Sequence, residues 1–498
     1  MLKQNNDMKT LDVLIIGAGF AGICAGIRLD RSGIKNFRIY DKADGIGGTW
    51  WNNTYPGAAC DVPSHLYCYS FEPNPNWSRQ YAPQAEIQAY IEGCADKYGL
   101  RDRIHLGRHI RSLSYDDETA NWHAVFDDGE ELVARFVING SGGLHKPLMP
   151  DFKDRDQFAG TTMHTAEWDN EFDVTGKDIA MIGSAASAIQ VLPAIAPDAK
   201  SVTLYQRTPN YVLPRNDFEY SDRQKKWFAR LPLLSRLYRT FIFYFLEYRF
   251  FPIIVKQDFR AKRSEEVKRY IQYKVRGRKQ RKAALPQYEM GCKRILISDD
   301  FYDALNEDNV EVISDPIDHM TKTGIVSSDG TERNFDAIIY ATGYDMQGHM
   351  FSIDVTGANG QNLREIWKDR AESYLGVMVP GLPNYFMVTG PNTGVGTTSV
   401  VFMIEQSVNW IVRCIRKAGN NRIVKVSEQA NSDYNRKIQS ALADTVWATS
   451  CNSWYKKSDG SIETLYPFDA RTFRRQMRRI DKSHVHFEKA PAPMEAAQ

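Results

Sequence analysis

The chain has 498 residues, and its 63 lysines and arginines nearly balance its 61 aspartates and glutamates, which leaves a formal net charge of +2. A charge this small gives no reason to expect nucleic acid as a partner, so we expect small-molecule partners. The length predicts two or three domains.

The N-terminus, MLKQNNDMKT, is polar and lacks the apolar core of a signal peptide. No apolar run reaches the roughly 18 residues that a membrane-spanning helix needs. Seven cysteines are scattered along the chain without a CxxC pair, at positions 24, 60, 68, 94, 292, 414 and 451. We therefore expect seven thiols, a cytoplasmic protein and no metal site.

Residues 13–41, VLIIGAGFAGICAGIRLDRSGIKNFRIYD, predict a strand, a small-residue turn, a helix and a second strand. Gly17 permits the tight bend, Gly19 lets the backbone approach a pyrophosphate, and Gly22 lets helix and strand pack closely. The pyrophosphate would lie at the start of the helix. Asp41, 24 residues after Gly17, can accept hydrogen bonds from a ribose 2′-hydroxyl, which predicts FAD in this domain.

Further strands are expected near residues 104–106, 122–126 and 136–139, before the Pro-rich crossing HKPLMPDF. Residues 179–207, IAMIGSAASAIQVLPAIAPDAKSVTLYQR, then repeat the first plan. The residues of this turn expected to contact a nucleotide are Gly183, Ser184, Ala185, Ser187 and Ala188. Ala185 stands where a glycine is usual, which leaves the effect on cofactor affinity open.

Arg207 occupies the place that Asp41 holds in the first copy. A guanidinium suits a 2′-phosphate, and the Thr208 hydroxyl can serve the same phosphate, so the second turn predicts NADPH. We thus expect an α/β protein with two Rossmann-like domains, one for FAD and one for NADPH. Such a pair implies hydride transfer from nicotinamide to flavin.

From residue 222 to about residue 282 the chain becomes helical and strongly basic. The stretch LYRTFIFYFLEYRFFPIIV, residues 237–255, is its most aromatic part and could dock weakly on a membrane surface. Arg239, Glu247 and Arg249 interrupt the apolar stripe, however. We favour a helix buried against its own domain with its arginines in solvent.

Strands are expected again at residues 310–313 and 337–341, and the last third of the chain has the pattern of a return to the first domain. The sequence therefore predicts five segments. They are an FAD-binding first part at 1–145, an NADPH-binding first part at 151–215, a helical insertion at 216–290, an NADPH-binding second part at 291–342, and an FAD-domain return with the C-terminal region at 343–498.

Two segments are more specific than either glycine turn: GGTWWNNTYPGAACD at residues 47–61 and FAGTTMHTAEWD at residues 158–169. Here the chain resembles the type I Baeyer–Villiger monooxygenases, whose fingerprints are [AG]GxWxxxx[FY]P[GM]xxxD and FxGxxxHxxxW[PD]. The fixed places are filled by Gly47, Gly48, Trp50, Tyr55, Pro56, Gly57 and Asp61, and by Phe158, Gly160, His164, Trp168 and Asp169. The resemblance extends over nearly the whole chain.

The resemblance implies roles for individual residues. Arg294, in the Lys-Arg pair after the insertion, would hold a flavin peroxide as its anion, and Asp61 would orient it. Lys293 would help Arg207 bind the 2′-phosphate. Further FAD contacts are expected from Gly48, Thr49, Trp50, Tyr67 and Ile110, and Trp454 would close over the nicotinamide, although core packing remains an alternative for the last three. His164 is interpreted as a hinge and packing residue.

The implied activity is NADPH- and O2-dependent conversion of ketones to esters or lactones through a C4a-peroxyflavin. The alternative is oxygenation of sulfur or nitrogen nucleophiles, which would not need Arg294. A disulfide reductase needs a close redox cysteine pair, which the sequence lacks, and a nucleotide-sensing regulator would have no use for Asp61 and Arg294. The ketone stays open, because GVGTTSV departs from the GLGHNS-like run of many relatives and leaves the size of the substrate undetermined. The oligomeric state stays open as well.

Overall fold

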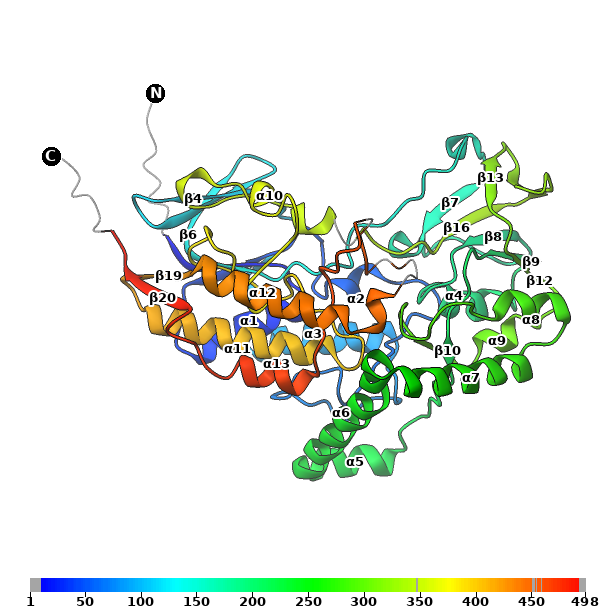
Figure 1. The fold of residues 1–498 in the computed structure, drawn as a ribbon, viewed down its shortest axis with the longest axis horizontal. Coiled ribbons are helices and arrows are strands. Elements are labelled where there is room, and N and C mark those ends of the chain that lie inside the picture. Colours follow the sequence, from blue (N-terminus) through cyan, green and yellow to red (C-terminus); the bar gives the residue numbers. More distant parts are fainter. Residues whose placement is uncertain (1–9, 346–347, 450–452, 454, 458, 492–498) are drawn as a thin grey trace.

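The computed structural model describes residues 10–345, 348–449, 453, 455–457 and 459–491. Two sheets lie in separate lobes, and helices cover them (Figure 1). The larger sheet has eight strands, in the order β17-β4-β5-β6-β1-β2-β3, with β18 also paired to β6. Its strands are β1 Leu11–Ile16, β2 Phe37–Tyr40, β3 Ile104–His105, β4 Ile110–Asp116, β5 Asn121–Phe126, β6 Glu131–Asn139, β17 Asp354–Thr356 and β18 Tyr385–Met387.

The centre of this sheet is parallel: β1 pairs with both β2 and β6, and β2 pairs with β3. Strands β17 and β18, from the last third of the chain, join β4 and β6, so the chain does return to the first sheet. The helices beside it are α1 Phe20–Arg31, α2 Thr49–Asn52, α3 Gln84–Lys97, α10 Leu363–Ile366, α11 Val400–Ala418, α12 Glu428–Ala443 and α13 Ala470–Gln476. The two-stranded antiparallel sheet of β19 Arg422–Val426 and β20 Val485–Lys489 lies at the C-terminal end of the chain.

The second sheet has five parallel strands in the order β12-β9-β8-β16-β7. They are β7 Thr161–His164, β8 Asp178–Ile182, β9 Ser201–Tyr205, β12 Val310–Ile313 and β16 Ala337–Tyr340, with α4 Ala188–Ile195 and α9 Phe301–Ala304 beside them. A three-stranded antiparallel sheet follows, made of β13 Ile317–Met320, β14 Gly324–Ser327 and β15 Glu332–Asn334. The predicted α/β architecture with two Rossmann-like domains is confirmed.

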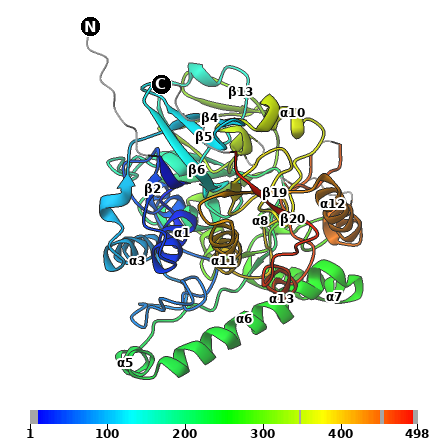
Figure 2. The ribbon, with the colours of Figure 1, turned by 90° about the vertical axis from the view of Figure 1, so that its left-hand side faces the viewer.

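The insertion is a set of helices, α5 Asp222–Arg230, α6 Pro232–Val255, α7 Gln257–Lys274 and α8 Arg278–Ala284. Both ribbon views place α5 and the first half of α6 at the edge of the molecule (Figures 1 and 2). Ser221 begins α5 with a capping box shared with Gln224. The chain leaves the second lobe through β10 Val212–Leu213 and re-enters it through β11 Leu296–Ile297, which pair in parallel.

One expectation for α6 is wrong. The arginine Arg239 is not in solvent: it donates to the carbonyls of His65 and Leu66 at 2.9 and 3.0 Å, and it lies 3.6 Å from the buried carboxylate of Glu405. The outward face carries aromatic and leucine side chains instead. Arg239 and Glu247 hold the helix to the protein, because their partners are buried in the first lobe.

The expectation of seven thiols is wrong at one position. Cys24, Cys60, Cys68, Cys94 and Cys414 are buried free thiols, whereas Cys292 is disulfide-bonded. Cys451 lies outside the described residues. Pairing depends on proximity in the fold, which the spacing of scattered cysteines does not reveal. Across the described ranges, every helix is too short or too polar to traverse a bilayer.

Candidate active site

The first glycine turn connects β1 to α1 and has no room for side chains. A Cβ on Gly22 would come 1.7 Å from the Gly17 carbonyl oxygen, so only glycine lets the helix lie this close to the turn. Gly19 faces Gly48, whose Cα would be 3.4 Å from a Cβ placed on Gly19. Two backbone segments thus meet where a pyrophosphate would lie, and the residues fit a bound dinucleotide.

Asp41 follows β2 and reaches back to this turn. Its carboxylate accepts hydrogen bonds from the amides of Ala18 at 2.6 Å and Ala43 at 2.9 Å. Each carboxylate oxygen has a second lone pair, which leaves Asp41 able to accept from a ribose hydroxyl. The side chain thus holds the turn, and it could also accept a hydrogen bond from a ribose.

The other predicted FAD residues occupy different environments. Thr49 begins α2 directly after Gly48. Trp50 is buried, and its indole Nε1 donates to the Tyr67 hydroxyl at 3.2 Å. Ile110 begins β4, and its side chain is fully buried in the hydrophobic core with Leu113. The aromatic pair therefore lies beside the loop of Asp61, whereas Ile110 contributes a core side chain.

The second turn repeats the first with one difference. Gly183 has a φ of +110°, and a Cβ there would come 2.4 Å from the Ala341 carbonyl oxygen, so glycine is required. Ser184 is buried and its hydroxyl donates to the Thr208 carbonyl at 3.3 Å. Ala185 is exposed, so its methyl group clashes with no protein atom. Ser187 and Ala188 lead into α4.

Two cations lie near this turn. Arg207 is exposed directly after β9, and Lys293 stands 5.0 Å from the centre of the Tyr288 ring. Burial and the charge of Arg207 lower the pKa of Lys293, and no carboxylate among the described residues opposes this lowering. Neighbouring cations that repel one another fit a phosphate, which would relieve the repulsion.

Asp61 and Arg294 meet across 233 residues of chain. Arg294 Nε donates to Asp61 Oδ2 at 3.1 Å, and Arg294 Nη2 donates to the same oxygen. The two side chains remain 42% and 29% accessible, Arg294 and Asp61 respectively, so the pair faces an open space and not the core. The carboxylate raises the pKa of Arg294 above its usual value. The guanidinium is therefore a fixed positive charge at this position.

Tyr455 is a site residue that the sequence did not single out. It is buried, its ring packs 6.3 Å from that of Trp447, and it lies close enough to Arg294 to feel its charge. Burial raises the pKa of Tyr455 to about 12, so it keeps its proton at neutral pH. Its position beside Trp454 was the available signal. Trp454 itself lies outside the described residues.

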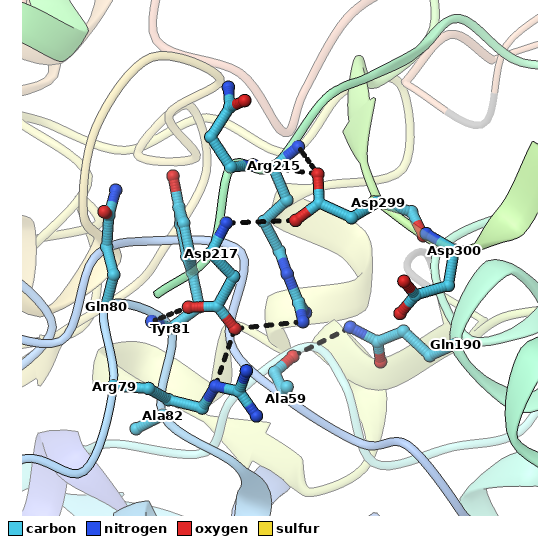
Figure 3. Close-up of polar contacts among 12 residues, drawn as sticks. Ala59, Arg79, Gln80, Tyr81, Ala82, Gln190, Arg215, Asp217, Asp299 and Asp300 are labelled. Carbon is cyan, nitrogen blue, oxygen red and sulfur yellow. Dashed lines mark hydrogen bonds and ion pairs between the residues drawn. The ribbon is translucent and has the colours of Figure 1, made fainter. Parts of the chain in front are cut away.

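An ion cluster around the buried carboxylate of Asp217 connects the segments that carry Asp61 and Arg294. Asp217 accepts from Arg79 Nε at 2.7 Å and from Arg215 at 3.2 Å, and its side chain is 4% accessible. Asp299 accepts from the amides of residues 215, 216 and 217 at 2.9, 2.9 and 3.0 Å (Figure 3). Asp299 follows the strand after Arg294, and Arg79 belongs to the loop of Asp61. The cluster therefore ties the two segments to the start of the insertion.

Gln190 connects α4 of the second lobe to the Asp61 loop. Its amide Nε2 donates to the Ala59 carbonyl at 2.9 Å (Figure 3). Its Oε1 accepts from the Tyr55 hydroxyl at 3.0 Å. A Cβ on Gly57 would come 2.5 Å from the Gln190 carbonyl oxygen. The first fingerprint thus makes a direct contact with the helix that follows the second glycine turn.

His164, in the second fingerprint, ends β7. It is buried, its Nδ1 accepts from the Ala166 amide at 3.0 Å, and burial lowers its pKa to about 4. It is therefore neutral at pH 7 and packs beside Tyr344, on the chain that returns to the first lobe. Over the described ranges, no group of three or more His, Cys, Asp or Glu is placed to hold a metal ion.

Known proteins resemble this chain over nearly its whole length. The family model described as pyridine nucleotide-disulphide oxidoreductase matches residues 14–223. A protein of Streptomyces coelicolor named Baeyer-Villiger monooxygenase is 36% identical over 97% of this chain and 93% of its own. One of Pseudomonas aeruginosa with the same name is 37% identical over 96% of this chain and 92% of its own.

Solved structures agree with these relatives. An oxidised steroid monooxygenase bound to NADP superimposes with a TM-score of 0.87 at 29% identity, over 96% of this chain and 100% of that one. A closed cyclohexanone monooxygenase gives a TM-score of 0.88 at 27% identity, over 97% of this chain and 99% of that one. A cyclohexanone monooxygenase with bound ε-caprolactone gives a TM-score of 0.86 at 27% identity, over 96% of this chain and 100% of that one.

Proposed function

Since this chain belongs to the Baeyer–Villiger monooxygenases, we propose that it converts ketones to esters or lactones and that Arg294 and Asp61 are its catalytic pair. The protein uses FAD and NADPH. Bound FAD would take electrons from NADPH and deliver one oxygen atom of O2. The observation that supports the proposal is the charged pair at the junction of the two lobes, facing an accessible space.

Arg294 has the properties that oxygen insertion into a ketone requires. Attack on a carbonyl carbon needs a nucleophilic oxygen that carries negative charge, and a fixed guanidinium nearby stabilises that charge. Asp61 binds Nε and Nη2 of Arg294 through one oxygen, which orients the guanidinium and leaves its other face available. The buried, protonated Tyr455 lines the same place and adds no competing charge.

Cofactor contacts are assigned in the same way. We assign the FAD pyrophosphate to Gly17, Gly19, Gly22, Gly48 and Thr49, the ribose to Asp41, and flavin contacts to Trp50, Tyr67 and Ile110. The NADPH pyrophosphate is assigned to Gly183, Ser184, Ala185, Ser187 and Ala188, and its 2′-phosphate to Arg207, Thr208 and Lys293. The five predicted segments, 1–145, 151–215, 216–290, 291–342 and 343–498, would be the parts of the FAD and NADPH domains and the insertion.

The substrate class follows from the same family. Relatives of known structure include steroid and cyclohexanone monooxygenases, one with a bound lactone, so cyclic and steroid ketones are the first compounds to test. A panel of cyclic, linear, aryl and steroid ketones, with products identified by mass spectrometry, would name the substrate. Cytoplasmic NADPH would supply the electrons.

Replacing Arg294 tests the proposal. In Arg294→Ala, NADPH should still reduce the flavin under anaerobic conditions. Ester formation should fall by at least about 10²-fold, because only the oxygen-transfer step requires the fixed positive charge. Sulfoxidation of a thioether should persist, since it needs no anionic oxygen. Arg278→Ala, at the exposed start of α8, is the control. Ester formation at the wild-type rate in Arg294→Ala would refute the assignment.

A further inference from the structure

The outward face of α6 is apolar along most of its length. Leu233, Leu237, Phe241, Phe245 and Tyr248 recur every three or four residues and are 46–68% exposed. At helical spacing these five side chains lie on one side of the helix, and we call them the outer strip. The rings of Phe241 and Phe245 stack with centroids 6.0 Å apart. Such a contiguous exposed apolar surface marks an interaction site in a soluble protein.

The inward face of α6 fixes the strip in this orientation. Arg239 is bound to two carbonyls and to Glu405, and the buried carboxylate of Glu247 accepts from the Thr397 hydroxyl at 2.7 Å and from the Ala470 amide at 3.0 Å. Turning the strip inward would break these buried polar contacts, and each broken contact would leave a charge without its partner. The exposed strip is therefore a stable feature of the fold.

Exposed apolar side chains are concentrated in this part of the molecule. Ten of the fifteen large hydrophobic residues that are exposed in the described chain lie between residues 222 and 274. They include Trp227 in α5 and Leu231 at the turn into α6, which are 46% and 54% exposed. Both ribbon views place α5 and this end of α6 at the periphery, with no other element beyond them (Figures 1 and 2).

Positive charge is concentrated in the same segment. Residues 222–282 hold 19 of the 63 lysines and arginines but only 5 of the 61 aspartates and glutamates, so the segment carries +14 and the rest of the chain −12. Around the strip, Arg223, Lys226, Arg230 and Arg236 are exposed. An apolar stripe flanked by cations is complementary to an anionic lipid surface, where the headgroups are negative and the acyl chains lie just beneath.

We propose that α5 and α6 dock this protein on an anionic lipid membrane, with the outer strip in the interfacial layer and the flanking cations on lipid phosphates. The helices would lie on the membrane, since no described helix is able to cross one. A second copy of the chain is a poorer occupant, because it would bring two segments of +14 together. This proposal is independent of the reaction catalysed at Arg294.

Vesicle flotation of the FAD-loaded full chain tests the proposal. The wild type should float with phosphatidylcholine vesicles that contain phosphatidylglycerol, less with pure phosphatidylcholine, and less again at high salt. The triple variant Leu237→Ser, Phe241→Ser, Phe245→Ser should bind at least about ten-fold more weakly because it removes buried apolar area. The variant Arg223→Gln, Lys226→Gln, Arg230→Gln, Arg236→Gln should lose the preference for anionic lipid.

Leu148→Ser is the matched control, because Leu148 is 47% exposed but lies in the linker between the two lobes, outside the insertion. FAD content and NADPH oxidation should be unchanged in the strip variants, which shows that they fold. The proposal is overturned if no vesicle captures the wild type, or if the strip variants bind as well as the control. It is also overturned if light scattering shows a wild-type dimer that the triple variant converts to a monomer.

Discussion

The Asp61–Arg294 contact shows how far single residues could be predicted. The fingerprint and the Lys-Arg pair predicted both residues, and the structure brings them within hydrogen-bonding distance. The Asp217–Arg79–Arg215 cluster that connects their segments was not predicted. Each of its members looks like an ordinary surface charge in the sequence, and only the fold reveals that they share a buried site. Tyr455 was missed although it follows Trp454 in the sequence, because only the fold brings it close to Arg294.

Lys293 predicts a pH dependence for coenzyme binding. Burial and Arg207 lower its pKa, so it should lose its charge at a lower pH than an ordinary lysine. The KM for NADPH should therefore rise with pH on the alkaline side, starting below the usual lysine range, while the KM for NADH should change little. Lys293→Arg keeps the charge and should flatten the profile. Identical profiles for both coenzymes in the wild type would argue against a phosphate at Lys293.

At the scale of elements, the glycine turns could be predicted from the sequence, because each requires a close approach of backbone segments within a short stretch of residues. The sequence did not predict which side of α6 faces the protein. Arg239, Glu247 and Arg249 interrupt its apolar pattern, and the usual assumption places such charges in solvent. In the structure the buried partners of Arg239 and Glu247 come from distant segments, at Glu405 and Thr397. The hydrophobic pattern of one helix cannot show partners that other helices supply.

The packing of α1 on its turn gives a test of the first nucleotide site. Gly22→Ala should yield protein with little bound FAD, because the new methyl group would sit 1.7 Å from the Gly17 carbonyl oxygen and push the turn apart. Gly93→Ala, in the exposed face of α3, meets no atom within 4 Å and should gain about 1 kcal/mol of stability. The ratio of flavin to protein absorbance distinguishes the two. Full FAD occupancy in Gly22→Ala would contradict this packing.

For the whole molecule, the resemblance predicted from two fingerprints is confirmed by relatives that are 36–37% identical over 96–97% of the chain. The pair of cofactors is confirmed as well. The ketone was not predictable, because Asp61, Arg294 and Tyr455 come together from the first lobe, the segment after the insertion and the C-terminal segment. Side chains there come from parts of the chain whose contacts are set only by the tertiary fold.

Glu405 on α11 connects the insertion to the FAD lobe. Its side chain is 2% accessible, lies 3.6 Å from both Arg28 and Arg239, and accepts from the Ser70 amide and hydroxyl. Glu405→Leu should lower the apparent free energy of unfolding by about 3–5 kcal/mol, because two partly buried arginines lose their counter-charge. Glu488→Gln, which removes an exposed pair with Lys425, should cost less than about 1 kcal/mol. Equal denaturation midpoints for both variants would show that Glu405 is not a structural centre.

The Gln190 bridge has a consequence for engineering. Because α4 holds the Tyr55 hydroxyl and the Ala59 carbonyl directly, the two lobes are not interchangeable modules. In a chimaera whose NADPH lobe comes from a homologue, the helix of the homologue would pack against the 53–62 loop of this chain. Any shift of that loop would also displace the carboxylate of Asp61. Grafts should therefore exchange α4 and the loop as one unit.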